Sequence, residues 1–174
     1  QGSSTYYAPN PRNALVVGDV TGDGIDDVVA GAPNADRGAT PGVGKILVFD
    51  GSGAWSGTIS PRATLDASKA NQYANVSGVF LSSGLFVHDV TGDGVRDVLG
   101  VATESGAGGS IYVWKGGSGL SGTLDATARL RQQNYVKDDS MGNAAPGVGM
   151  LFVDFDRDGI DDVFAAAPFA DLNG

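Results

Sequence analysis

Aspartate residues recur at fixed spacings in three ten-residue segments of the chain. The segments are Asp19 to Val28 (DVTGDGIDDV), Asp89 to Val98 (DVTGDGVRDV) and Asp154 to Val163 (DFDRDGIDDV). All three fit the pattern D-x-[T/D]-x-D-G-x-x-D. Acidic side chains at alternate positions of a tight loop direct several oxygens at one centre, and Ca²⁺ takes about six to eight oxygen ligands. The spacing therefore predicts three calcium sites and about three bound Ca²⁺ ions.

The candidate ligands are the side chains at positions one, three, five and nine of each loop, and the backbone carbonyl at position seven. The side chains are those of Asp19, Thr21, Asp23, Asp27, Asp89, Thr91, Asp93, Asp97, Asp154, Asp156, Asp158 and Asp162, and the carbonyls are those of Ile25, Val95 and Ile160. Gly24, Gly94 and Gly159 at position six permit a sharp turn. The third loop has one more ligand carboxylate than the others, so we expect it to bind calcium most tightly.

An EF-hand, an ion-free turn and a magnesium site each fit these loops less well. An EF-hand needs a glutamate at position twelve, where this chain has Ala30, Gly100 and Ala165. Turns without an ion would also use Asp and Gly, but crowded carboxylates without a cation would repel one another. Magnesium demands tighter octahedral geometry. Calcium loops that lead into strands are the better interpretation.

The net charge of the protein is concentrated in these loops. The 174 residues carry a formal charge of −9, of which −10 belongs to the three segments and +1 to the rest. This balance argues against an electrostatic grip on nucleic acid or anionic membrane. We expect no nucleic-acid partner and no membrane insertion, since no apolar run approaches the length of a spanning helix.

Catalytic signatures are missing from the sequence. The chain has no cysteine, which removes disulfides, thiolate zinc sites and cysteine nucleophiles. It has no G-x-S-x-G elbow and no P-loop. The single histidine, His88, has Gly18 and Val153 at the equivalent places. We therefore expect a protein that is not an enzyme, although a catalytic domain elsewhere in a longer parent protein stays open.

The loops belong to a longer repeat of all-β character. Short apolar runs enter and leave each loop, and Lys45–Phe49 has its counterpart in residues 110–114. More polar fourth strands begin near residues 62 and 128. Four strands per unit of about 65 residues, rich in glycine, favour β-propeller blades. Residues 1–174 then form a single domain, with units at about 14–83, 84–148 and a partial 149–174.

The first unit carries a resemblance to a known family. The loop followed by Val28-Val29-Ala30-Gly31-Ala32-Pro33, and then by Gly44–Phe49, resembles the FG-GAP repeats of integrin alpha-subunit β-propellers and their bacterial relatives. The second unit has Gly100-Val101-Ala102-Thr103 instead of Gly-Ala-Pro, and the third has Ala166-Ala167-Pro168. The resemblance implies blades of four antiparallel strands, calcium between the first two strands, and an extracellular or cell-surface, secreted location.

About two and a half units do not close a propeller of four to eight blades. An open blade exposes an unpaired strand edge, so we expect an incomplete propeller unless other chains complete it. Three arrangements stay open: a fragment of a longer propeller with further blades, self-association or association with another chain, and an elongated stack completed by strand addition.

The function indicated is a calcium-stabilised binding, adhesion or scaffold module with an unknown protein or glycan ligand. One alternative is a carbohydrate-binding (lectin) propeller, for which Trp55, Trp114, Tyr73 and Tyr135 are the candidate stacking residues. Trp114 lies in a predicted strand, where packing in the core is the stronger interpretation. Another alternative is a non-catalytic module or fragment of a larger secreted enzyme.

Overall fold

A computed structural model describes residues 15–38, 40–53, 55–67, 81–102, 109–131 and 149–166. These residues form eleven β-strands and no helix. The all-β class expected from the apolar runs is therefore confirmed for this part of the chain. No helix within it is long and apolar enough to cross a membrane.

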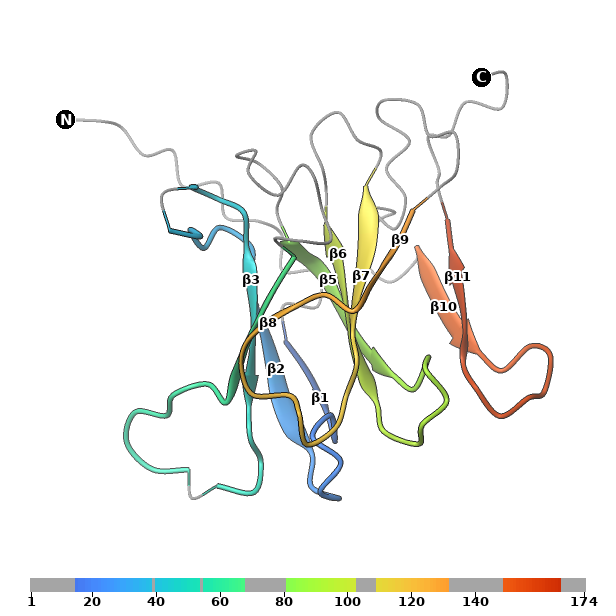
Figure 1. Cartoon of the computed structure of the whole chain (residues 1–174), viewed down its shortest axis with the longest axis horizontal. Coiled ribbons are helices and arrows are strands. Elements are labelled where there is room, and N and C mark those ends of the chain that lie inside the picture. The colour runs from blue at the N-terminus through green and yellow to red at the C-terminus, as the bar shows by residue number, and fades with distance from the viewer. Residues whose placement is uncertain are drawn as a thin grey trace.

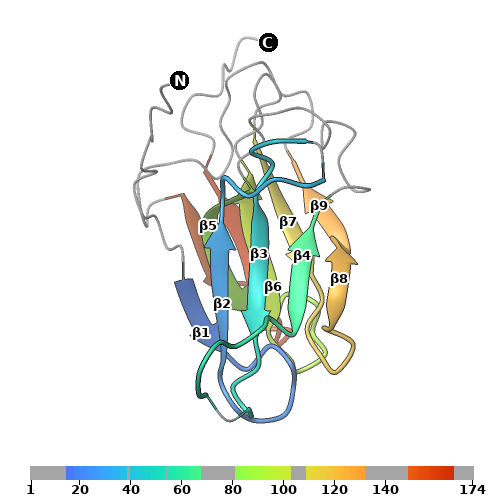
Figure 2. The same cartoon turned by 90° about the vertical axis from the view of Figure 1, so that its left-hand side faces the viewer.

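The four strands of the first unit and one strand of the second form a sheet with the order β1-β2-β3-β4-β8. Its strands are β1 (Leu15–Gly18), β2 (Asp27–Ala32), β3 (Lys45–Phe49), β4 (Ala63–Asp66) and β8 (Gly122–Asp125). The first four strands are antiparallel, as predicted. Figure 2 shows the strands of this sheet next to one another, with β8 beyond β4.

The second and third units repeat the arrangement. The second sheet has the order β5-β6-β7-β9 and the third contains β10 and β11, all antiparallel. Their bounds are β5 (Leu81–His88), β6 (Asp97–Ala102), β7 (Ser110–Trp114), β9 (Ala128–Leu130), β10 (Met150–Val153) and β11 (Asp162–Ala165). The three sheets stand side by side and do not close into a ring (Figure 1), which agrees with an incomplete propeller.

Strand β8 is the one element that the repeat did not predict. It belongs to the second unit but pairs in parallel with β4 of the first, with Ala63 opposite Gly122. The backbone N–H of Gly122 donates to the Arg62 carbonyl at 2.9 Å, and the Arg62 Nε donates to the Leu120 carbonyl at 3.1 Å. Adjacent units are thus joined through their backbones as well as through side chains.

The hydrophobic core lies between the sheets. One cluster joins residues of the first sheet, such as Val29, Ile46 and Leu65, to Leu85, Tyr112 and Trp114 of the second. A smaller cluster joins Leu99, Val101, Ile111 and Val113 of the second sheet to side chains of β10 and β11. Trp114 is almost fully buried and its Nε1 donates to the Asp66 carbonyl at 3.0 Å, which confirms its packing in the core.

The three aspartate loops lie at one end of the stacked sheets. Each connects the first two strands of its unit: β1 to β2, β5 to β6 and β10 to β11. Figure 1 shows all three loops at its lower side. The fold therefore places about ten negative charges at one end of the molecule.

Candidate metal centres

Each aspartate loop is closed by the same hydrogen bonds from backbone N–H groups to its carboxylates. The first-position carboxylate accepts from the position-six N–H, at 2.8, 2.8 and 3.0 Å in the three loops. The fifth-position carboxylate accepts from position seven, and the ninth-position carboxylate accepts from position two. These bonds fix the carboxylates at positions one, five and nine, which are all predicted ligands, to the backbone of each loop.

The third loop gathers carboxylates most closely. Oxygens of Asp154, Asp156 and Asp162 lie within 4.8 Å of one another. Asp158, the fourth predicted carboxylate, is outside this group, and its Oδ1 accepts from the Ile160 N–H at 2.8 Å. Among the described residues, the first two loops bring no three carboxylates this close together. Threonine replaces the third-position aspartate there, so each has one carboxylate fewer.

Two buried oxygens in these loops have no hydrogen-bond partner. They are the Thr21 Oγ1 and the Asp154 Oδ1. Thr21 is 4% exposed. A buried polar atom without a partner loses the free energy of its hydration, and a cation in the loop would supply a partner for both atoms. The donor set, made of carboxylate, hydroxyl and carbonyl oxygens, is of the kind that Ca²⁺ prefers. The residues therefore fit a calcium ion.

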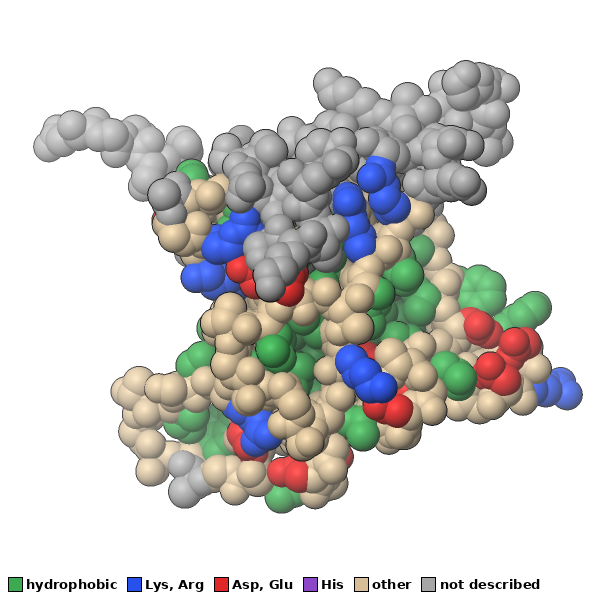
Figure 3. Space-filling view, in the orientation of Figure 1, with side chains coloured by type: hydrophobic (Ala, Val, Ile, Leu, Met, Phe, Trp, Pro, Cys, Tyr) green, Lys and Arg blue, Asp and Glu red, His purple; other side chains and the backbone are tan. Residues whose placement is uncertain are grey.

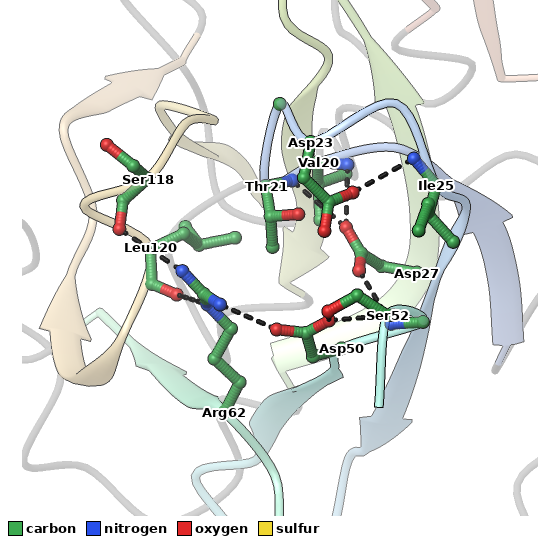
Figure 4. Close-up of polar contacts among 12 residues, drawn as sticks. Val20, Thr21, Asp23, Ile25, Asp27, Asp50, Ser52, Arg62, Ser118 and Leu120 are labelled. Atoms are coloured by element: carbon green, nitrogen blue, oxygen red, sulfur yellow. Dashed lines mark hydrogen bonds and ion pairs between the residues drawn. The ribbon is translucent and has the colours of Figure 1, made fainter. Parts of the chain in front are cut away.

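The ninth-position aspartates have a second task that the spacing did not reveal. Asp27 is fully buried; its Oδ2 accepts from Val20 and Thr21, and its Oδ1 accepts from the Gly51 N–H at 3.0 Å (Figure 4). In the second unit, the buried Asp97 bonds Val90, Thr91 and Gly116 in the same way. These carboxylates tie each loop to the turn that follows the third strand of its unit. No such bond is described for Asp162.

Gly51 and Gly116 are therefore part of the site, and ligand spacing alone could not find them. A Cβ on Gly51 would lie 2.0 Å from the Asp26 carbonyl oxygen, and one on Gly116 would lie 2.2 Å from that of Arg96. Only glycine lets the turn approach the loop this closely. The available signal was a glycine two residues after each third strand, Asp50-Gly51 and Lys115-Gly116.

A lysine side chain forms an ion pair with one carboxylate of the second loop. The Lys115 ammonium lies 3.1 Å from the Asp93 carboxylate. The Val95 N–H, and then the Lys115 side chain, hold the pKa of Asp93 below its ordinary value. In the first unit, Asp50 occupies the position of Lys115. Lys115 is therefore placed to compete with a metal ion for Asp93, a predicted ligand of the second loop.

Successive loops contact one another through their seventh positions. The Val95 side chain lies over Gly22, and that of Ile160 lies over Gly92. Gly22 and Gly92 have φ values of 76° and 72°, and the position-six glycines Gly24, Gly94 and Gly159 have 84°, 83° and 90°. Arg157 takes the place of Gly22 and Gly92 in the third loop, with φ 68°. The predicted sharp turns are confirmed at all three position-six glycines.

The candidate aromatic residues divide by exposure. Trp55 is 52% exposed, and its Nε1 donates to the Asp50 carbonyl at 3.0 Å. Tyr73 and Tyr135 lie outside the described residues. His88 stacks on Phe152 with a centroid distance of 4.1 Å, and its Nδ1 lies 2.9 Å from the Asp161 carboxylate. His88 thus joins the second unit to the third.

Comparison with known proteins identifies the repeat in the first unit. Residues 12–49 match the family model of the FG-GAP repeat. The match spans the first loop, β1, β2 and β3, so the resemblance seen in these residues is confirmed there. A comparison with curated proteins returned no match.

Proposed function

We propose that this protein is a calcium-stabilised binding module of the integrin-like β-propeller type, with one Ca²⁺ site in each of its three loops. The observation that carries the proposal is the third loop, where Asp154, Asp156 and Asp162 converge within 4.8 Å. The buried Asp154 Oδ1, which has no hydrogen-bond partner, supports it. The match of the first loop to the FG-GAP repeat supports the extension to the other loops.

Calcium would be structural in this module. The second and third loops each contact the preceding loop through their seventh-position side chains, and the ninth-position aspartates fix the first two loops to the turns that follow their third strands. An ion that neutralises a loop would therefore also stiffen the contact between units. Binding, adhesion or scaffolding would then fall to other surfaces of the module, with a protein or glycan ligand and no catalytic step.

An extracellular or cell-surface location suits such sites. The acidic side chains at positions one and five lie in exposed loops, and exposed calcium sites of extracellular modules have dissociation constants of about 10⁻⁴–10⁻³ M. Free calcium outside cells is high enough to fill sites of this affinity. The FG-GAP match favours the same location.

The test is a calcium titration by isothermal calorimetry together with native mass spectrometry. We expect about three ions, with the third loop binding most tightly and the second most weakly because of Lys115. Asp156→Asn removes a converging carboxylate and should weaken the tightest site about tenfold or more. Asp161→Asn is the matched control, since Asp161 is in the same loop but faces His88 and is not a predicted ligand.

Two results would contradict the proposal. One is a chain that binds no calcium at millimolar concentration. The other is an equal loss of affinity in Asp156→Asn and Asp161→Asn, because the converging oxygens would then not be the ligands. Thermal unfolding gives a second measurement: excess chelator should lower the melting temperature if the ions are structural.

A glycan-binding role is the second candidate, and the exposed indole of Trp55 favours it. The hydrogen bond from its Nε1 to Asp50 orients a largely exposed ring, and sugars stack on such rings. A glycan array with the protein and with Trp55→Ala tests it. Binding that Trp55→Ala abolishes would support a lectin, and an array without binding would remove this candidate.

A further inference from the structure

The exposed hydrophobic side chains of this protein gather at the two ends of its stack of sheets. We call the face of a unit that points toward the next unit along the chain its leading face, and the opposite face its trailing face. The leading face of the third unit exposes Leu151, Val153, Phe155 and Phe164; the trailing face of the first unit exposes Leu15, Val17, Ile25 and Trp55. Among the described residues only one other large hydrophobic side chain, that of Leu130, is exposed.

The trailing face has two buried equivalents inside the molecule. Counted from the first aspartate of each loop, Leu15 and Val17 correspond to Leu85 and Val87 in the second unit and to Met150 and Phe152 in the third. Leu85 and Val87 pack in the core shared with the first unit. Met150 and Phe152 pack against the core of the second. The positions exposed in the first unit are thus those that fasten each later unit to its predecessor.

The loops repeat this relation. Val95 and Ile160, the seventh residues of the second and third loops, lie against Gly22 and Gly92 of the preceding loops. Ile25 holds the same position in the first loop and is 47% exposed. Trp55 is equivalent to Leu120, which is 1% exposed in the core between the first two units.

The leading face shows the complementary pattern. Phe164 corresponds to Val29 and Leu99, both fully buried between units, and Phe155 corresponds to Val20 and Val90, which pack in the same two clusters. Phe155 and Phe164 contact each other edge to face, with centroids 5.6 Å apart. Figure 3 shows hydrophobic side chains beside the acidic ones on this part of the surface. The third unit therefore carries a preformed apolar surface like those that receive a trailing face twice within the chain.

We infer that the trailing face of one copy of this chain docks on the leading face of a second copy, in a head-to-tail contact. The chain carries both halves of the interface. The residues equivalent to the trailing face and those equivalent to the leading face pack against each other between the units of a single chain. Exposed apolar patches of this kind mark protein contact sites. Because the two faces differ, the contact is heterologous and can repeat from copy to copy. This inference does not depend on calcium binding.

Arg157 should weaken the proposed contact between copies. Where Gly22 and Gly92 receive the next loop, the third unit has Arg157. Its side chain narrows the socket that Ile25 of a second copy would enter, since a Cβ on Gly92 would already lie 2.4 Å from the Ile160 Cδ1. Arg157→Gly restores the socket and should tighten association.

The experiment measures mass by sedimentation equilibrium over a range of concentrations. Val17→Asp blocks the trailing face and Leu151→Asp blocks the leading face. The mass of the wild type should rise with concentration above its monomer value of 17.6 kDa. Each variant alone should stay monomeric, but an equimolar mixture should form a dimer, because one partner keeps its leading face and the other its trailing face. Thr123→Asp adds the same charge at an exposed position on β8 and should behave as the wild type.

Two results of this experiment would overturn head-to-tail association. A wild type that is monomeric at all concentrations overturns it. Variants that still associate alone overturn it too, because contact between like faces or strand edges would then hold the copies together. Leu15→Lys and Phe164→Lys form a second pair that must repeat the pattern, with far-ultraviolet circular dichroism to establish that each variant is folded.

Discussion

At the scale of single residues, the ninth aspartate of each of the first two loops stabilises the fold through hydrogen bonds that need no bound ion. The buried Asp97 carboxylate accepts hydrogen bonds from the Val90, Thr91 and Gly116 N–H groups. These three backbone donors come from both sides of the contact between loop and turn. Their only described partner is this one side chain, so the carboxylate is a structural centre even without calcium.

Asp97→Asn should therefore destabilise the protein in the absence of calcium. An amide has one acceptor oxygen, whereas the three N–H donors use both oxygens of the carboxylate. A buried donor left without a partner costs about 1–3 kcal/mol. We expect the free energy of unfolding in excess chelator to fall by about 2–4 kcal/mol. Urea unfolding measures it, with the exposed Asp36→Asn as control. An unchanged midpoint in chelator would mean that Asp97 acts only through the ion.

Asp50 is a second residue with a measurable signature. The Ser52 hydroxyl and N–H donate to its carboxylate, and the Arg62 guanidinium pairs with it at 2.6 Å (Figure 4). These contacts, led by those of Ser52, hold the pKa of Asp50 below its ordinary value. A pKa that is lower in the folded state stabilises the protein above the unfolded pKa, and the stabilisation is lost as pH falls.

Asp50→Asn should accordingly lower the melting temperature at neutral pH, and the difference from the wild type should shrink as the pH falls through the acidic range. Ser52→Ala should raise the pKa of Asp50 toward its ordinary value, which the pH titration of the carboxyl ¹³C resonance measures. A gap between Asp50→Asn and wild type that stays constant down to pH 2 would contradict this role. Thr123→Asn, at an exposed strand position, is the control.

At the scale of elements, the sequence predicts what is local and misses what depends on a neighbouring unit. Apolar runs and Asp-Gly loops specify β1, β2, β5, β6, β10 and β11 because each pair is joined by a loop with strong turn chemistry. The Ser-Gly-Thr at residues 56–58 and that at 121–123 are identical. Only the second becomes part of a strand, β8, because only it lies beside the β4 of a preceding unit.

The candidate sites show the same division. Spacing within nine residues predicted the acidic positions that the loop backbone holds by hydrogen bonds, since the predicted ligands and the turn share one short segment. It could not identify the partners of Asp27 and Asp97, because Gly51 and Gly116 are brought there by the return of the third strand. The convergence of Asp154, Asp156 and Asp162 matches the expectation for the third loop, whereas the order of affinities stays a prediction.

The turn after β3 allows a matched test of this packing. A Cβ on Gly51 would lie 2.0 Å from a backbone oxygen, whereas one on Gly53 would meet its nearest atom at an ordinary 3.7 Å. Gly51→Ala should destabilise the protein by about 2 kcal/mol or more, because the loop and the turn must separate. Gly53→Ala should change stability by less than about 0.5 kcal/mol. Equal effects in urea unfolding would mean that the close approach does not limit this turn.

At the scale of the whole molecule, the position of the net charge of −9 matters as well as its size. The three loops carry all of the excess negative charge and lie together at one end (Figure 1). The second loop contacts the first through Val95, and the third contacts the second through Ile160. Repulsion among the loops therefore acts directly against the contacts that stack the units.

Three Ca²⁺ ions would change the net charge from −9 to about −3 and remove most of the repulsion. Salt screens what the ions do not neutralise: the screening length falls from about 10 Å at 0.1 M to about 3 Å at 1 M. The melting temperature in chelator should thus rise with sodium chloride by several degrees, while that of the calcium-loaded protein should change little. Differential scanning calorimetry of both forms across this range measures the two slopes. Asp36→Asn removes a negative charge outside the loops and should leave both slopes unaltered, and equal slopes for the two forms of the wild type would show that loop repulsion does not limit stability.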